Sequence, residues 1–298
     1  MTSFWGYLTE GTFLLVLAFW WMVNTCYDII QSKHEKSEVR SKHSYTWPGT
    51  NIPVEIFYKL FISAFGFFGQ LVYGRGEFYD SDGNFDNMTE LMYMSVYGIF
   101  LLHSLLDLCQ WCRLPIPRGS NYAAAATGFF WYALALYNRS HDFAERPVSM
   151  MTLTFPGYLL LSISVVFVLE PLWLSGSVTQ LVRAFFLQTY ATWCWQSGFI
   201  LHAHSGFPGS AENPAWDQTD HRNTAFTAAF FGLHLCLNLV FAALTYSLTA
   251  YFMRMRFGIQ VDNSEDLTSG YGYKPLSTDY SSSEVDGANA KRLSAFVA

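Results

Sequence analysis

Long apolar segments alternate with short polar connections along most of the chain. Seven of these segments have about the 20 residues that a helix needs to cross the hydrocarbon core of a bilayer. The connections between them carry Gly, Pro and charged residues, which favour turns. The pattern predicts an all-α fold, a polytopic membrane bundle of seven transmembrane helices over residues 1–256. The predicted spans are 11–30, 54–73, 89–112, 120–138, 151–173, 179–203 and 224–252.

The composition supports a membrane protein, except in the C-terminal segment, which is polar. Of 298 residues, 51% are hydrophobic and 13% are charged, against about 25% charged in soluble domains. The net charge of -6 argues against a nucleic-acid partner. Residues 257–298 are polar and have too few apolar side chains to form a core. We therefore predict a bilayer-embedded domain followed by a disordered cytoplasmic tail.

Lys and Arg indicate the orientation of the predicted bundle. The first connection, the third connection and the tail carry four, two and five of them. The opposite side has Arg75, Arg139 and Arg146, with Arg222 at the edge of the last span. Cytoplasmic loops are enriched in Lys and Arg, so we expect the N-terminus outside and the C-terminus in the cytoplasm. Two glycosylation sequons, beginning at Asn87 and Asn138, fall on the predicted outer side.

Ionisable side chains inside the spans are costly in hydrocarbon and are expected to pair with one another. Five of them fall toward the predicted cytoplasmic ends, and we expect a paired network that fixes helix packing. Arg183 would pair with Asp107 or Glu170 across helices. The five residues are Asp28, Lys59, Asp107, Glu170 and Arg183.

Two of the histidines inside predicted spans, His103 and His234, are candidate binding residues. His103 and Asp107 are four residues apart and share one helix face. This spacing suits a His oriented by a carboxylate or two metal ligands, and interhelical hydrogen bonding explains it equally well. His234 lies four residues before Asn238, which favours a hydrogen-bonded bundle histidine. The sequence gives no complete ligand set, so we predict no metal, no cofactor and no catalytic residue.

Aromatic clusters at 19–21, 129–132 and 193–195 suit either a lipid or sterol cavity or packing and interfacial anchoring. For the first two clusters we favour packing. The third cluster, Trp193 and Trp195, stands beside Gln196.

An unpaired amide in hydrocarbon costs roughly 2–7 kcal/mol, so Gln196 should have a polar partner. We expect it to face inward toward His202 or His234, with Trp216 and Asp217 of the next loop capping it.

The run Thr192-Trp193-Cys194-Trp195-Gln196-Ser197-Gly198-Phe199 resembles the T-W-x-W-Q-x-G-F signature of the TMEM45 family (DUF716) of seven-span proteins. The loop around Asp217 resembles that family's P-x-W-D-Q element, and His234 falls where the family carries a His in its last span. The resemblance implies a Golgi, endosomal or plasma-membrane protein. The chain departs from the family at Tyr93 and at 135–137, where relatives carry histidines. A metal site built from those histidines would therefore be largely missing here.

The tail contains a candidate sorting motif. Gly272-Tyr273-Lys274-Pro275-Leu276 resembles the Tyr-x-x-apolar signal that clathrin adaptors read. An extended peptide of this kind adds to a sheet edge and places Tyr273 and Leu276 in two pockets. We therefore predict a clathrin adaptor as a partner, and passage through endosomes or lysosomes.

These observations favour a non-enzymatic multi-pass protein of the endomembrane and plasma-membrane system, with a scaffold or trafficking role. One alternative is a seven-helix receptor, although Gln110-Trp111-Cys112-Arg113 stands where an acidic-Arg-Tyr motif is expected. The other is a His-based, metal-dependent membrane enzyme. That enzyme would need about three converging His or Asp ligands, and the last span offers one His.

Overall fold

The computed structural model describes residues 4–35, 42–47, 50–73, 87–172, 177–202 and 217–258. The chain divides into two units, 1–261 and 262–298, and all described residues belong to the first. Among the described residues every regular element is a helix, which confirms the predicted all-α fold. The helices are α1 (Phe4–Glu35), α2 (Val54–Tyr73), α3 (Met88–Trp111), α4 (Ser120–His141), α5 (Pro147–Leu172), α6 (Ser177–His202) and α7 (His221–Phe257).

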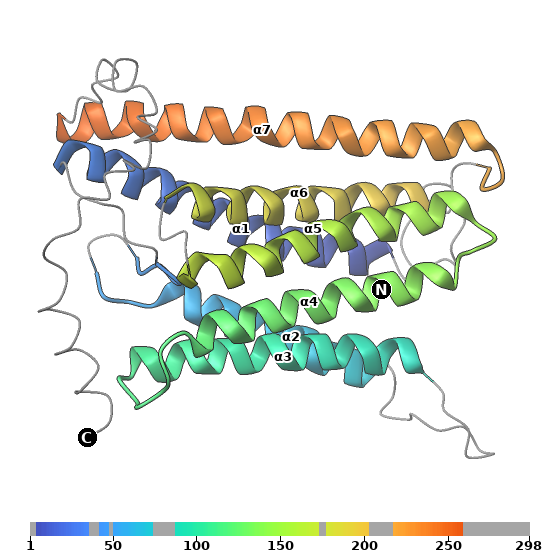
Figure 1. Cartoon of the computed structure of the whole chain (residues 1–298), viewed down its shortest axis with the longest axis horizontal. Helices are drawn as coiled ribbons and strands as arrows, with labels where there is room; N and C mark the ends of the chain where they lie inside the picture. The colour runs from blue at the N-terminus through green and yellow to red at the C-terminus, as the bar shows by residue number, and fades with distance from the viewer. Residues whose placement is uncertain are drawn as a thin grey trace, which may run out of the picture. The chain divides into compact units, whose positions relative to one another are not determined.

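The seven helices of this unit lie side by side, with α7 at one edge and α2 and α3 at the opposite edge (Figure 1). Five of them, α1, α2, α3, α5 and α7, are long and apolar enough to cross a membrane. Helices α4 and α6 carry more polar residues, and they pack between other helices. Helix α6 contacts α1, α5 and α7, while α4 lies between α3 and α5. The chain is therefore a multi-helix membrane protein, and the count of seven spans stays a prediction.

Capping residues, which hydropathy does not report, set the ends of α7. The Asp220 side chain accepts a hydrogen bond from the backbone N–H of Arg222 at 2.8 Å, so the helix begins before the apolar segment. At the other end Gly258 adopts a left-handed conformation with φ of 67°, which ends the helix. Helix α1 also begins seven residues before the predicted span at 11–30, and it therefore includes the buried Glu10.

Helices α1 and α6 form the most extensive contact of the bundle, and a glycine makes it possible. A Cβ atom at Gly11 would lie 2.8 Å from the carbonyl oxygen of Ala191 and would overlap the ring of Trp195. Only a residue without a side chain permits this approach.

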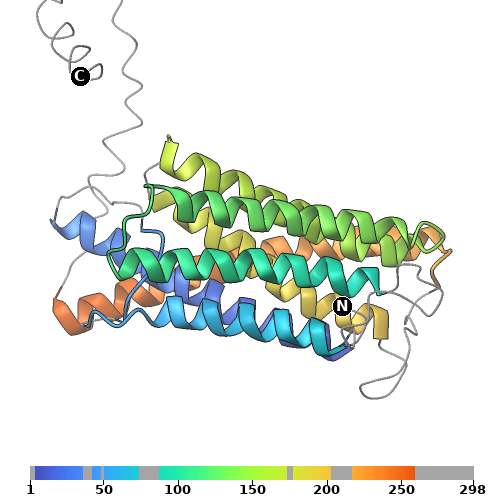
Figure 2. The ribbon, with the colours of Figure 1, turned by 90° about the horizontal axis from the view of Figure 1, so that it is seen from below.

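Helix α7 has a different character, because many of its large apolar side chains, such as Leu237, Leu248 and Tyr251, are exposed. In a membrane protein such a surface contacts lipid tails. Figure 2 shows the same unit from below.

Candidate functional site

A cavity of about 290 Å³ lies among helices α1, α2, α3 and α4. Its walls are mainly aromatic and aliphatic. Trp21 and Phe129 belong to the two aromatic clusters that are predicted to serve packing, and both side chains line this cavity. They also belong to the hydrophobic core, so these clusters combine packing with cavity lining.

Polar groups stand at two levels of this cavity. Glu10 marks one level, and Trp21, whose ring lies beneath the guanidinium of Arg183, marks the other. Eleven residues of helix α1 separate them, a length of about 16 Å at 1.5 Å per residue. The cavity therefore joins a long apolar wall to polar groups at separated positions.

At the first level a buried carboxylate is held by two tyrosines. The hydroxyls of Tyr132 and Tyr190 both donate to Glu10 Oε1, the second at 2.7 Å, and the two hydroxyls lie 2.7 Å apart. Glu10 is 7% exposed and also lines the cavity. The sequence prediction missed this residue because Glu10 was placed just outside the first apolar segment.

At the second level a buried lysine lies between two carboxylates. Lys59 Nζ lies 2.6 Å from Asp107 Oδ2 and 3.0 Å from Glu55 Oε1. All three side chains are almost completely buried. Glu55 also accepts a hydrogen bond from the backbone N–H of Tyr45 at 2.8 Å, so α2 and α3 are tied to the connection after α1.

The predicted pairing of Arg183 across helices is confirmed, with Glu170 as the partner. Arg183 Nη1 lies 2.9 Å from Glu170 Oε2, and both side chains are fully buried. The guanidinium also lies over the ring of Trp21, 4.6 Å from its centroid. Asp28, the remaining member of the predicted network, pairs with Lys42 at 2.8 Å. Each of the five ionisable residues is thus paired. The network also contains Lys42 and Glu55, which lie outside the predicted set.

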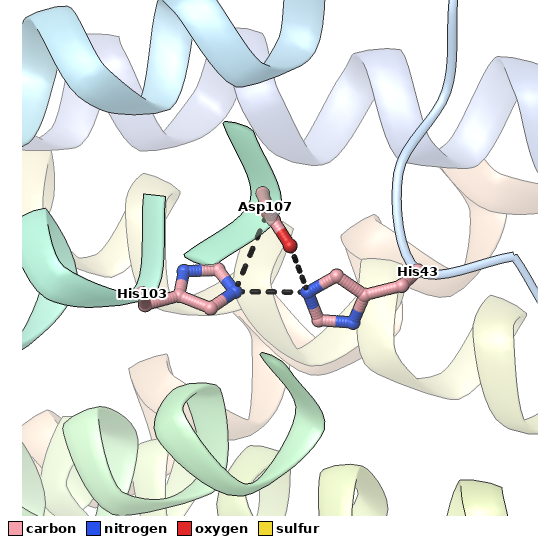
Figure 3. Close-up of side chains that lie close together, drawn as sticks. All are labelled: His43, His103 and Asp107. Atoms are coloured by element: carbon pink, nitrogen blue, oxygen red, sulfur yellow. Dashed lines mark hydrogen bonds and ion pairs between the residues drawn. The ribbon is translucent and has the colours of Figure 1, made fainter. Parts of the chain in front are cut away.

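His103 and Asp107 share one face of α3, as their spacing predicts, and a third side chain meets them. This residue is His43, from the connection between α1 and α2 (Figure 3). His43 Nε2 lies 2.9 Å from His103 Nε2 and 3.1 Å from Asp107 Oδ1, while His103 Nε2 lies 3.6 Å from Asp107 Oδ2. We refer to His43, His103 and Asp107 as the histidine cluster.

The position of His43 is fixed by the connection around it. Tyr45, two residues later, shares a hydrogen bond with Thr25 of α1 at 3.0 Å. The His43 ring packs edge-on against Tyr122, with ring centroids 4.5 Å apart. Burial lowers the pKa of His43, and the neighbouring Asp107 only partly opposes this effect. The imidazole is therefore held in its neutral form, which is the form that binds metal ions.

The region around Trp193 differs from its prediction. Trp193 is fully buried, donates to the carbonyl of Thr152 at 3.1 Å and packs edge-on against His234. Gln196 is half-buried and forms no hydrogen bond to any described residue, so its predicted bond to His202 or His234 is wrong for this part of the chain. Trp195 is 39% exposed.

The buried amide of α6 is instead Gln188. Its side-chain nitrogen donates to Asn238 Oδ1 of α7 at 2.8 Å. Asn238 in turn donates to the hydroxyl of Thr192 and to the backbone carbonyl of His234. These bonds connect the middle of α6 to α7, one turn or more from the predicted position.

The remaining predicted residues lie apart from the cavity. Asp217 is exposed and accepts bonds from the N–H and hydroxyl of Thr219, which lower its pKa. Its predicted capping partner, Trp216, lies outside the described residues, as do Tyr273 and Leu276. Asn87 directly precedes α3, and Asn138 is exposed in the last turns of α4. The predicted cap of Trp216 and Asp217 over Gln196 and the glycosylation of Asn87 and Asn138 therefore stay predictions.

Together, the apolar helices, the buried ion pairs and the cavity define an all-helical membrane protein with a polar-ended internal cavity. Residues 119–247 match the family of unknown function DUF716. The predicted resemblance is thereby confirmed at the level of that family. The matched segment runs from the start of α4 into α7. It contains Trp193, Gln196 and His234, whereas the histidine cluster lies before it.

Proposed function

We propose that this protein binds a single-chain amphipathic lipid in the cavity among α1–α4. The observation that carries the proposal is the cavity itself, which combines aromatic walls with polar groups at separated levels. Sites for small molecules are mostly apolar with a few placed polar groups, and typical volumes begin at about 300 Å³. A cavity of about 290 Å³ suits one chain with a small polar head.

The outer surface of α2 offers a route into this cavity. A shallow groove on α2 is lined by apolar residues that include Phe65 and Gly69. The same two residues line the internal cavity. A Cβ atom added at Gly69 would meet no atom within 4 Å, so there is open space beside the helix. A ligand dissolved in the bilayer would therefore enter sideways past Gly69.

A role in membrane traffic is the second candidate function, carried by the tail sequence around Tyr273 and Leu276. In this proposal the N-terminus lies outside and the tail is cytoplasmic, so adaptors can reach the motif. Lipid binding by the bundle and sorting by the tail are compatible, because they use different parts of the chain.

Photolabelling tests the lipid-binding proposal. Cells expressing the full chain receive a photoreactive, clickable palmitic acid analogue, and labelled peptides are mapped after irradiation. We expect saturable labelling of α1 and α2 that excess palmitate reduces. Gly69→Leu places a side chain in the open space and should reduce this labelling severalfold.

The matched control is Gly232→Leu. Gly232 is a helical glycine of α7 that also has no atom within 4 Å of an added Cβ. This variant should label like the parent. Equal labelling of both variants, or labelling confined to α7, would show only general contact with membrane lipid and would overturn the proposal.

A further inference from the structure

We infer that the histidine cluster, His43, His103 and Asp107, is a binding site for one divalent transition-metal ion, and that zinc is the ion it favours. The cluster offers two imidazole nitrogens and one carboxylate oxygen. Zinc accepts this donor set, and three protein ligands with one open position are typical of zinc sites that exchange water or substrate. Calcium and magnesium prefer sites made of oxygen atoms alone.

The distances within the cluster match the requirements of a tetrahedral ion. Zinc–nitrogen and zinc–oxygen bonds are about 2.0–2.2 Å long, so ligand atoms at tetrahedral angles lie roughly 3.3–3.5 Å apart. In the structure His43 Nε2 lies 2.9 Å from His103 Nε2 and 3.1 Å from Asp107 Oδ1, whereas the 3.6 Å contact of His103 Nε2 is with Asp107 Oδ2. One ligand atom from each residue lies within 4.8 Å of the other two, so a rotation of the Asp107 carboxylate with small shifts of the two rings would place all three around one centre.

Hydrogen bonds alone leave some polar atoms of the histidine cluster without a suitable partner. His43 Nε2 faces both His103 Nε2 and Asp107 Oδ1, yet it can carry only one hydrogen atom. Asp107 Oδ1 is buried and lies 3.1 Å from His43 Nε2, but this contact lacks the geometry of a hydrogen bond. A buried oxygen that lacks a well-formed hydrogen bond is costly. A cation at the centre would bind all three lone pairs at once.

The surrounding charges also favour a cation. Lys59 is shared between Glu55 and Asp107, so these three groups together carry one negative charge. The nearby Arg183 is already neutralised by Glu170. Lys59 approaches Oδ2 of Asp107, which leaves Oδ1 directed to His43. A buried, uncompensated negative charge is unfavourable, and a bound metal ion offsets it.

The cluster borders the cavity, because His103 lines it. A ligand in the cavity would therefore bring its polar head close to the ion. This last step rests on the proposed lipid binding, whereas metal binding itself does not. Loss of metal and loss of lipid labelling are separate measurements, so the two proposals can fail independently.

Metal content of the full chain tests the inference. The protein is purified in detergent through a tag without histidines, dialysed against metal-free buffer and analysed by mass spectrometry of the elements. We expect about one zinc ion per chain. After replacement by Co²⁺, the protein should show d–d absorption of the intensity typical of tetrahedral sites.

Variants separate this site from other sources of metal. His43→Ala changes a residue outside the helices, and His103→Ala removes the ligand on α3; each should lose the zinc and the Co²⁺ absorption. His34→Ala, an exposed histidine at the end of α1, should retain both. A parent protein with neither zinc nor the Co²⁺ bands would overturn the inference. An unchanged zinc content and Co²⁺ spectrum in His43→Ala would do so equally.

Discussion

Replacing Glu170 by Leu tests whether buried ion pairs hold this bundle together. Glu170 on α5 and Arg183 on α6 are both fully buried, with a 2.9 Å contact between nitrogen and oxygen. Glu170→Leu leaves the guanidinium of Arg183 without its counter-charge in the bundle interior. The matched double variant, Glu170→Leu with Arg183→Met, removes both charges and keeps apolar volume in place.

The structure sets the size of the expected effects. Removing one partner of a buried pair costs about 3–5 kcal/mol, whereas replacing both by apolar residues is often neutral. The contact of Arg183 with the ring of Trp21 persists in the single variant, so it does not add to the loss. Glu170→Gln keeps an acceptor but loses the charge, and should cost about 1–2 kcal/mol. We therefore expect Glu170→Leu to be the least stable, with Glu170→Gln between it and the parent.

Thermal unfolding in detergent measures this order. Cys26 and Cys194 are buried, whereas Cys109, Cys112 and Cys236 are accessible. With these three replaced by Ser in every variant, a fluorogenic maleimide reacts with Cys26 and Cys194 as the bundle opens. At roughly 2–4 °C per kcal/mol, Glu170→Leu should lower Tm by about 6–20 °C. The double variant should remain within a few degrees of the parent. A single variant that unfolds with the parent, or a double variant as unstable as the single, would refute this reasoning.

Three further predictions concern other parts of the chain. Gly11→Ala should separate α1 from α6 and lower Tm by several degrees in the same assay, because its Cβ overlaps the ring of Trp195. Gly232→Ala, whose Cβ meets no atom, should keep or slightly raise Tm because Ala favours a helix. Equal Tm values for the two variants would contradict the close approach of α1 and α6. Tyr273→Ala should raise the surface-biotinylated fraction, while Tyr271→Ala, whose +3 residue is charged, should not; three equal fractions would mark the motif as a chance match. A C-terminal epitope tag should resist protease added outside intact cells, and its digestion there would reverse the proposed orientation.

The positions of the helices along the chain were accessible from the sequence because each is a long apolar segment bounded by polar residues. The Arg183–Glu170 pair was accessible for a related reason, since charges in hydrocarbon must be paired. The spacing of His103 and Asp107 also predicted a shared helix face. Each of these features follows from one local requirement: burial of an apolar segment, pairing of a buried charge, or the spacing of residues on one helix face.

Other features depend on tertiary contacts that a sequence pattern does not report. His43 lies in a connection without helical periodicity, and the hydrogen bonds of Tyr45 hold that connection in place. The predicted first span begins at residue 11 and so leaves out Glu10, yet two tyrosines from α4 and α6 hold this carboxylate inside the bundle. Gln196 and Gln188 are two turns apart on α6, and only the position of Asn238 decides which amide is paired.

Native mass spectrometry of the detergent-released protein tests the central claim, that the cavity holds a lipid, most directly. The parent should retain one adduct with the mass of a single-chain lipid at collision energies that remove detergent. Gly69→Leu should lose this adduct, and Gly232→Leu should keep it. A bare parent chain, or the same adduct on Gly69→Leu as on Gly232→Leu, would contradict the claim.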